Sequence, residues 1–136
     1  MGKFTCNEVI VLSNVFIKRI YEPYDEMDGF RILVDRLWPR GISKDAARLS
    51  FWFKEIAPSN ELRKSFCHVP ELFEEFRSRY LEELRTDEEK RDLVRKILEL
   101  SADGRVTLLY GAKEPIYNHA QVLMEELKGH SSRFNG

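Results

Sequence analysis

Two short apolar runs constrain the fold of this chain more than any other feature of its sequence. Ile32-Leu33-Val34 lies in an expected strand over residues 30–37, and Val106-Thr-Leu-Leu-Tyr110 forms most of an expected strand over residues 105–110. A strand that is apolar at successive positions has no polar face to turn toward water, so both faces must be covered. This pattern is typical of parallel strands in α/β proteins, where helices cover the sheet.

The other segments between the chain start and residue 56 are less distinctive. Residues 14–20 contain β-formers and are predicted to form a strand that Glu22-Pro23 ends. Residues 23–29 are rich in turn formers, of which Asp28-Gly29 is the tightest signal. Residues 49–56 fit a strand or a helix, because a short apolar run does not distinguish the two.

Four helices are expected in the second half of the chain. Ser59 is the predicted N-cap of the first, and Pro70 suits the first position of the second. A Thr86–Glu89 capping box predicts the start of a third helix, which Gly104 ends. A fourth helix is expected over residues 117–128. The stripe Phe73, Phe76, Tyr80 and Leu84 is expected to pack in the core rather than to cradle a cofactor.

This order of elements predicts one α/β domain with a small, mainly parallel sheet flanked by helices. A length of 136 residues fits a single domain, whose core we expect at about residues 14–128. The charges nearly cancel, with 22 Lys+Arg against 23 Asp+Glu, which makes a broad nucleic-acid surface unlikely.

Targeting and ligation signals are also weak. The start lacks the pattern of a secretory signal, and no run reaches the roughly 18–20 apolar residues that cross a bilayer, so we expect a cytoplasmic protein. A disulfide between Cys6 and Cys67 is not expected there. His68, His119 and His130 show no metal-ligand spacing, and neither a metal nor a cofactor is expected.

The segment after the second strand is the first candidate for a binding loop, because ligands of parallel sheets bind beyond the carboxyl ends of the strands. Residues 31–44 hold four basic residues and one acid. Arg36 and Arg40 offer planar donors for a carboxylate or phosphate, and Trp38 offers a face for stacking. The alternative is that Arg36 pairs with a buried acid and that Trp38 fills the core.

The segment between Tyr110 and His119 is the second candidate loop. It leads from the end of a strand to the start of a helix, whose backbone N–H groups attract anions. Asn118 is suited to cap this helix, and His119 would follow in its first turn. His119 is either part of a site or, as a single histidine, structural.

Several catalytic motifs are absent from the sequence. There is no P-loop, no Gly-x-Gly-x-x-Gly, no Gly-x-Ser-x-Gly, no His-Glu-x-x-His and no Cys-x-x-Cys. The Cys-x5-Arg loop of cysteine phosphatases is also missing, because Leu12 and Phe73 stand six positions after the two cysteines. Nothing in the motif content therefore identifies an enzyme.

Several segments together resemble one known family. They are Leu33-Val-Asp-Arg-Leu-Trp-Pro-Arg-Gly41, Ala57-Pro-Ser59, Glu61-Leu-Arg63, Phe76, Arg79-Tyr80, Glu83-Leu84, Val106-Thr-Leu-Leu-Tyr110 and Asn118-His-Ala120. They resemble the YeaO-like branch of domain-of-unknown-function family 488 (DUF488) over roughly residues 14–128. The wider family is distantly similar to the rhodanese and cysteine-phosphatase class, which implies a layered α/β fold.

The resemblance also implies a degenerate site. The apparently active branch carries a pattern like Cys-Ala-Glu … Cys-His-Arg after its last long strand. Here Tyr110 stands at the nucleophile position, Asn118 at the second cysteine and Ala120 at the arginine, so only His119 remains. Thiolate catalysis needs a sulfur with a lowered pKa, which a tyrosine does not supply.

Three hypotheses for the function follow. The first is a domain without thiol catalysis whose basic pocket binds a small anionic or nucleotide-like ligand through Arg36, Trp38, Arg40, Tyr110, Asn118 and His119. The second is a hydrolase or transferase with His119 as general base. The third is a module that binds a protein or structured RNA through Trp38 and the Arg79/Arg85 side of the helices.

Overall fold

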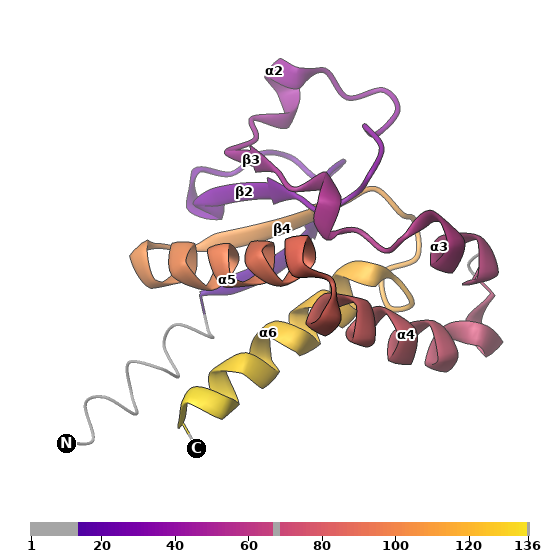
Figure 1. Cartoon of the computed structure of the whole chain (residues 1–136). Helices are drawn as coiled ribbons and strands as arrows, with labels where there is room; N and C mark the ends of the chain where they lie inside the picture. Colours follow the sequence, from indigo (N-terminus) through magenta and orange to yellow (C-terminus); the bar gives the residue numbers. More distant parts are fainter. Residues whose placement is uncertain (1–13, 67–68, 136) are drawn as a thin grey trace.

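Four parallel strands form one sheet in the computed structural model of the chain, which describes residues 14–66 and 69–135 and side chains as far as residue 130 (Figure 1). The order across the sheet is β1-β4-β2-β3. The strands are β1 (Val15–Arg19), β2 (Phe30–Leu33), β3 (Phe51–Trp52) and β4 (Val106–Tyr110). The α/β fold with a parallel sheet is therefore confirmed.

The two faces of the sheet are covered unequally. The long helices α4, α5 and α6 lie on one face, and the short helix α2 stands on the other side (Figure 1). The helices are α2 (Lys44–Ala47), α3 (Asn60–Phe66), α4 (Phe73–Thr86), α5 (Glu88–Asp103) and α6 (His119–Asn135), and the 3-10 turns are η1 (Glu26–Asp28), η2 (Lys54–Ile56) and η3 (Pro70–Leu72).

The strand β4 shows why both faces must be covered. Leu108 and Leu109 are successive residues, and neither has any exposed surface. Leu108 belongs to the large core cluster with α3–α6, which also contains the expected stripe from Phe73 to Leu84. Leu109 belongs to a second, smaller cluster against Trp38 and Trp52. Apolar residues at adjacent positions thus fill two different cores, as the sequence predicts.

Three predicted helix boundaries are confirmed. The Ser59 hydroxyl accepts a hydrogen bond from Leu62 N at 3.2 Å and so caps α3. Pro70 opens the turn η3 that leads into α4. Gly104 caps the end of α5. The expected turn at Asp28-Gly29 is also present, and Gly29 has a φ of 68°.

The second strand is shorter than residues 30–37. Its last ladder contact is the bond from Val34 N to Leu109 O at 3.0 Å. Gly111 follows the end of β4, and its N–H donates to the Asp35 carboxylate at 2.9 Å. This side chain takes the place of the backbone carbonyl that a longer β2 would have provided. The ambiguous residues 49–56 contain both kinds of structure, β3 followed by η2.

Two helix ends were predicted wrongly. The N-cap of α5 is Asp87, whose carboxylate accepts from Lys90 N at 3.0 Å, whereas Thr86 ends α4 and donates to Glu82 O. A carboxylate one position later outcompetes the threonine as a cap. The helix α6 starts at His119 and continues through Gly129 to Asn135, because one glycine inside a helix costs only about 1 kcal/mol.

Some sequence-based expectations fall on other parts of the chain. The described residues do not include Cys6, Cys67 or His68. The expectations that the two cysteines form no disulfide and that these residues bind no metal therefore stay predictions. No helix within the described residues is long and apolar enough to cross a membrane.

Candidate ligand-binding pocket

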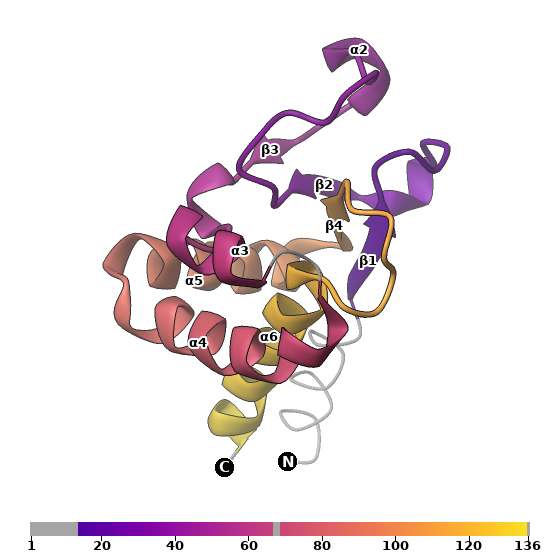
Figure 2. The same ribbon diagram turned by 90° about the vertical axis from the view of Figure 1, so that its right-hand side faces the viewer.

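A pocket of about 210 Å³ lies beyond the carboxyl ends of β2 and β4. Its walls come from the segment after β2, the segment after η2, α3, α4 and the segment leading into α6, which gather at one edge of the sheet (Figure 2). The lining residues are Asp35, Arg36, Leu37, Ala57, Pro58, Arg63, Phe66, Phe76, Ala112, Asn118 and His119.

The strand register explains why these segments meet. Leu33 of β2 pairs with Leu109 of β4, so the two central strands end side by side. Parallel strands direct the segments that follow them to the same edge of a sheet. The two loops singled out in the sequence therefore line a single pocket.

Asp35 and His119 form the polar floor of the pocket. One carboxylate oxygen of Asp35 accepts from Gly111 N at 2.9 Å. The other is buried and lies 3.1 Å from Nε2 of His119, but it has no hydrogen-bond partner among the described residues. The backbone carbonyl of Asp35 accepts from the Trp52 indole at 2.7 Å, which fixes the loop from the opposite side. The close contact at Gly111 needs a small residue, because a Cβ there would lie 3.1 Å from the Asp35 oxygen.

The start of α6 positions His119. The buried Asn118 side chain caps the helix by accepting from Gln121 N at 3.2 Å, and it donates to Glu114 O at 2.7 Å. Nε2 of His119 lies 3.0 Å from Val34 O, in addition to its contact with Asp35. Both neighbours are hydrogen-bond acceptors, so we assign a proton to Nε2.

Arg36 forms one wall of the pocket and is incompletely hydrogen-bonded. Its Nη1 lies 3.3 Å from Glu55, and its Nη2 donates to Ala57 O at 3.2 Å and Pro58 O at 3.4 Å. Its Nε is buried and has no hydrogen-bond partner among the described residues. Because this Nε has no accessible surface, a ligand in the pocket would meet the guanidinium at its outer nitrogens; the side chain as a whole is 25% accessible.

Arg63 brings a second guanidinium to the pocket from α3. Its Nη2 lies 3.3 Å from the Asn60 side chain at an exposed position. The helix is held in place through Ser59, whose N–H and hydroxyl both donate to Glu83 of α4, at 3.0 Å and 2.6 Å. The bonds of Ser59 therefore set where Arg63 and Phe66 stand along the wall.

Two tyrosines near the pocket are neutral donors rather than nucleophiles. Tyr80 is fully buried and donates to Ile56 O at 2.7 Å, and burial raises its pKa well above 10. Burial likewise raises the pKa of Tyr110, the residue at the nucleophile position of the family pattern. Neither hydroxyl supplies an anionic oxygen at neutral pH.

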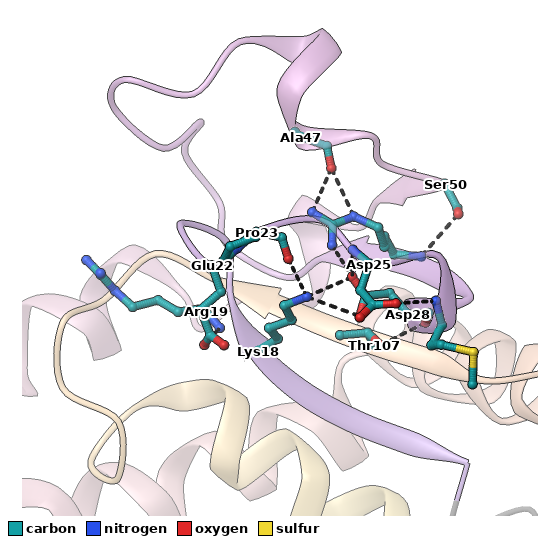
Figure 3. Close-up of polar contacts among 11 residues, drawn as sticks. Lys18, Arg19, Glu22, Pro23, Asp25, Asp28, Ala47, Ser50 and Thr107 are labelled. Carbon is teal, nitrogen blue, oxygen red and sulfur yellow. Dashed lines mark hydrogen bonds and ion pairs between the residues drawn. The ribbon is translucent and has the colours of Figure 1, made fainter.

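The structure disperses the basic cluster that the sequence shows over residues 31–44. Arg31 is not at the pocket but is buried on the other face of the sheet, where it pairs with Asp28 and donates twice to Ala47 O, at 3.0 and 2.9 Å. Lys18 also binds Asp28, at 3.0 Å, and Thr107 donates to Asp28 O at 2.7 Å (Figure 3). Arg31 and Arg36 are close in the sequence but lie at different places in the fold, and only Arg36 lines the pocket.

Trp38 and Arg40 also lie apart from the pocket. The Trp38 indole donates to Ile42 O at 2.6 Å, and its ring packs edge-on against Trp52 in the second core cluster. Arg40 is exposed, and its backbone carbonyl accepts from the Tyr21 hydroxyl at 2.7 Å. For Trp38 the structure shows the alternative of core packing.

Three of the six candidate residues line the pocket, namely Arg36, Asn118 and His119. The described lining residues do not include Trp38, Arg40 or Tyr110. Sequence reasoning did not select Asp35 or Arg63. Asp35 stands beside Arg36 directly after an apolar strand, which is a signal for a site at a strand end. Arg63 has no comparable signal, because only helix packing decides which way it faces.

The arginines proposed for an interaction surface have carboxylate partners. Arg79 lies 3.7 Å from Glu75, and Arg85 lies 2.9 Å from the buried Glu126.

No group of three or more histidine, cysteine, aspartate or glutamate side chains among the described residues is arranged to hold a metal ion.

Fold and site together define a parallel α/β domain with a pocket beyond the carboxyl ends of its central strands. The chain belongs to the inactive DUF488-N3 subclade of family DUF488, whose model matches residues 14–135. It is 44% identical to the uncharacterized protein YeaO of Escherichia coli (strain K12) over 115 residues, which are 85% of this chain and 97% of YeaO. It is also 44% identical to the uncharacterized protein Rv3073c of Mycobacterium tuberculosis over 117 residues, 86% of this chain and 96% of that protein. No solved structure matches the chain significantly.

Proposed function

We propose that this domain binds a small anionic ligand in the pocket between β2, β4 and α6 and performs no thiol chemistry. The observation that carries the proposal is the partly exposed guanidinium of Arg36, whose side chain is 25% accessible. Arg36 lines the pocket together with the second guanidinium of Arg63. Two arginines at a concave site are suited to a carboxylate or phosphate.

The contacts of Arg36 support a binding role. The carbonyls of Ala57 and Pro58 both accept from Nη2, so the guanidinium is already oriented. A group fixed before binding loses little side-chain entropy when the ligand arrives. The ion pair with Glu55 is partly exposed, with 25% and 43% of the two side chains accessible, so it is weak enough for a ligand to compete with it.

The environment of Tyr110 supports the absence of thiol-type catalysis. The residue is buried at the end of β4, and burial raises its pKa above the ordinary value of 10.0. It therefore stays protonated at neutral pH, where a nucleophile would have to be ionised. The description of the subclade as inactive agrees with this reasoning.

The test is an NMR titration of the isotope-labelled protein with small carboxylates and phosphates. We expect the amides of Ala112 and His119 to shift and Arg36→Met to weaken binding at least tenfold. Arg36→Lys shows whether charge alone suffices, and Arg95→Met, which removes an exposed arginine near Asp92, is the matched control. Binding that is equal in wild type and Arg36→Met would refute the proposal.

A second candidate is a hydrolase or transferase that uses His119 as general base, and the contact between His119 and Asp35 favours it. A carboxylate that orients a histidine is a common arrangement in such sites. However, Nε2 already faces Val34 O and Asp35, so the base would have to be Nδ1. If a substrate is found, His119→Ala must lower kcat at least a hundredfold, and unchanged turnover would exclude this role.

A further inference from the structure

The size of the pocket limits the ligand to about one ring. An apolar cavity of about 150 Å³ holds benzene, whereas pockets for drug-sized ligands have about 300–1,000 Å³. The present pocket, at about 210 Å³, lies between these values. It has room for a single ring or a short branched chain with one charged group, and it is too small to enclose a base, a ribose and a phosphate together.

The walls favour a ligand with an apolar body. Six of the eleven lining residues are apolar: Leu37, Ala57, Pro58, Phe66, Phe76 and Ala112. A bare inorganic anion would lose water against these walls without gaining hydrophobic contact. A ring or branched chain beside Phe66 and Phe76 gains that contact.

The charges in the pocket favour a monoanion. Asp35 stands in the same pocket as Arg36 and Arg63, so a bound anion is attracted by two groups and repelled by one. By Coulomb's law all three interactions double for a dianion, but the cost of removing an ion from water grows with the square of its charge and is about fourfold larger. A phosphate monoester is largely a dianion at neutral pH, with a second pKa of about 6, whereas a carboxylate carries a single charge.

The geometry points to a small organic carboxylate with a ring-sized apolar body as the ligand of this pocket. This inference rests on the proposed function and narrows it. The carboxylate lies against the Arg36 guanidinium with Arg63 beside it, and the apolar body lies between Leu37 and the two phenylalanines. A nucleotide is too large for the pocket to enclose, and inorganic phosphate has no apolar body to contact its walls.

The experiment is an NMR titration of the full chain with five probes: benzoate, phenyl phosphate, benzyl alcohol, inorganic phosphate and adenosine monophosphate. We expect benzoate to bind at least fivefold more tightly than phenyl phosphate and at least tenfold more tightly than the other three. Ala57→Leu, which fills the pocket without changing its charge, is expected to weaken benzoate binding at least fivefold. Arg36→Met tests the anion contact, and Arg95→Met is the control.

The possible failures are distinguishable. If phenyl phosphate, inorganic phosphate or the nucleotide binds as tightly as benzoate and this binding depends on Arg36, the carboxylate inference is wrong while the anion pocket stands. If benzyl alcohol binds as tightly as benzoate, or if no anion binds in an Arg36-dependent manner, the proposed function itself is wrong and the inference falls with it.

Discussion

Arg31 and Arg36 lie on one short segment, and each is paired with a carboxylate, yet they have different environments. Arg31 is 2% exposed, and all three of its guanidinium nitrogens bind protein acceptors, namely Asp28 and Ala47 O. Arg36 keeps a buried Nε that no described residue binds, and its partner Glu55 is partly exposed. A fully satisfied arginine has nothing left to offer a ligand, whereas an incompletely satisfied one does.

The difference arises from where the backbone carries each residue. Arg31 lies within β2, and its side chain binds Ala47 O of α2 and the Asp28 carboxylate. Lys18 binds the same carboxylate (Figure 3). Arg36 follows the end of that strand, at the edge where parallel strands leave a crevice. One arginine therefore ties the fold together, and the other stands at the candidate site.

The largest expected contrast is in stability. Arg31→Met removes a partner from the buried Asp28 and leaves Ala47 O without its donors, so we expect a loss of about 3 kcal/mol in the free energy of unfolding. Arg36→Met removes a partly exposed pair and should cost less than about 1 kcal/mol. Urea unfolding followed by circular dichroism measures both values, and equal losses would break the distinction between the two arginines.

A second contrast is the pH dependence of stability. Burial by itself would raise the pKa of Asp28, but hydrogen bonds from Lys18, the Asp25 backbone and Arg31 outweigh burial and hold this pKa below the ordinary value of 3.8. A depressed folded-state pKa stabilises the protein above the unfolded value, and this stabilisation disappears as the pH falls through the folded value.

The matching measurement compares wild type and Asp28→Asn by unfolding at several pH values. We expect the wild type to be more stable from neutral pH down to about pH 4 and the two stabilities to converge below it. A difference for Asp28→Asn that stays constant down to low pH would contradict the assigned role of Asp28.

The smallest expected effect concerns anion affinity. Glu55→Gln removes the carboxylate that competes with a ligand for Arg36, and a partly exposed pair of this kind is worth up to about 1 kcal/mol. We therefore expect benzoate to bind about two- to fivefold more tightly to this variant. Glu74→Gln, which removes an exposed partner of Arg77, is the control. Weaker binding in Glu55→Gln would show that Glu55 positions Arg36 rather than competes for it.

The parts of the fold that the sequence predicts correctly are those with a local cause. The apolar run of β4, the Ser59 cap, the Asn118 cap and the Gly104 helix end each depend on residues close together in the chain. The start of α5 and the end of β2 were predicted at the wrong residues, because in each case another side chain makes the hydrogen bond that the pattern assigns elsewhere. Asp87 replaces Thr86 as the cap of α5, and the Asp35 carboxylate takes the backbone N–H that a longer β2 would have bound.

The candidate site was predictable in position and only partly in composition. The rule that ligands of parallel sheets bind beyond the strand ends selects the two loops that do meet, and it brings Arg36 and His119 together. Trp38 resembles a stacking residue in the sequence but packs against Trp52. An indole whose N–H donates to a carbonyl and whose ring has an aromatic neighbour is buried at no polar cost. Arg63 enters the pocket only through the docking of α3 on α4 by Ser59 and Glu83.

The sequence by itself determined the α/β class and the family, because these depend on residue identity and local pattern. Only the tertiary structure decided which cation faces the pocket. Residues 31–44 include four basic side chains. Arg31 lies within β2 and binds Asp28, whereas Arg36 follows the end of the strand and lines the pocket. A count of charges along the sequence does not say where each side chain points. In the folded protein, the acceptors around each basic group decide whether it can bind a ligand.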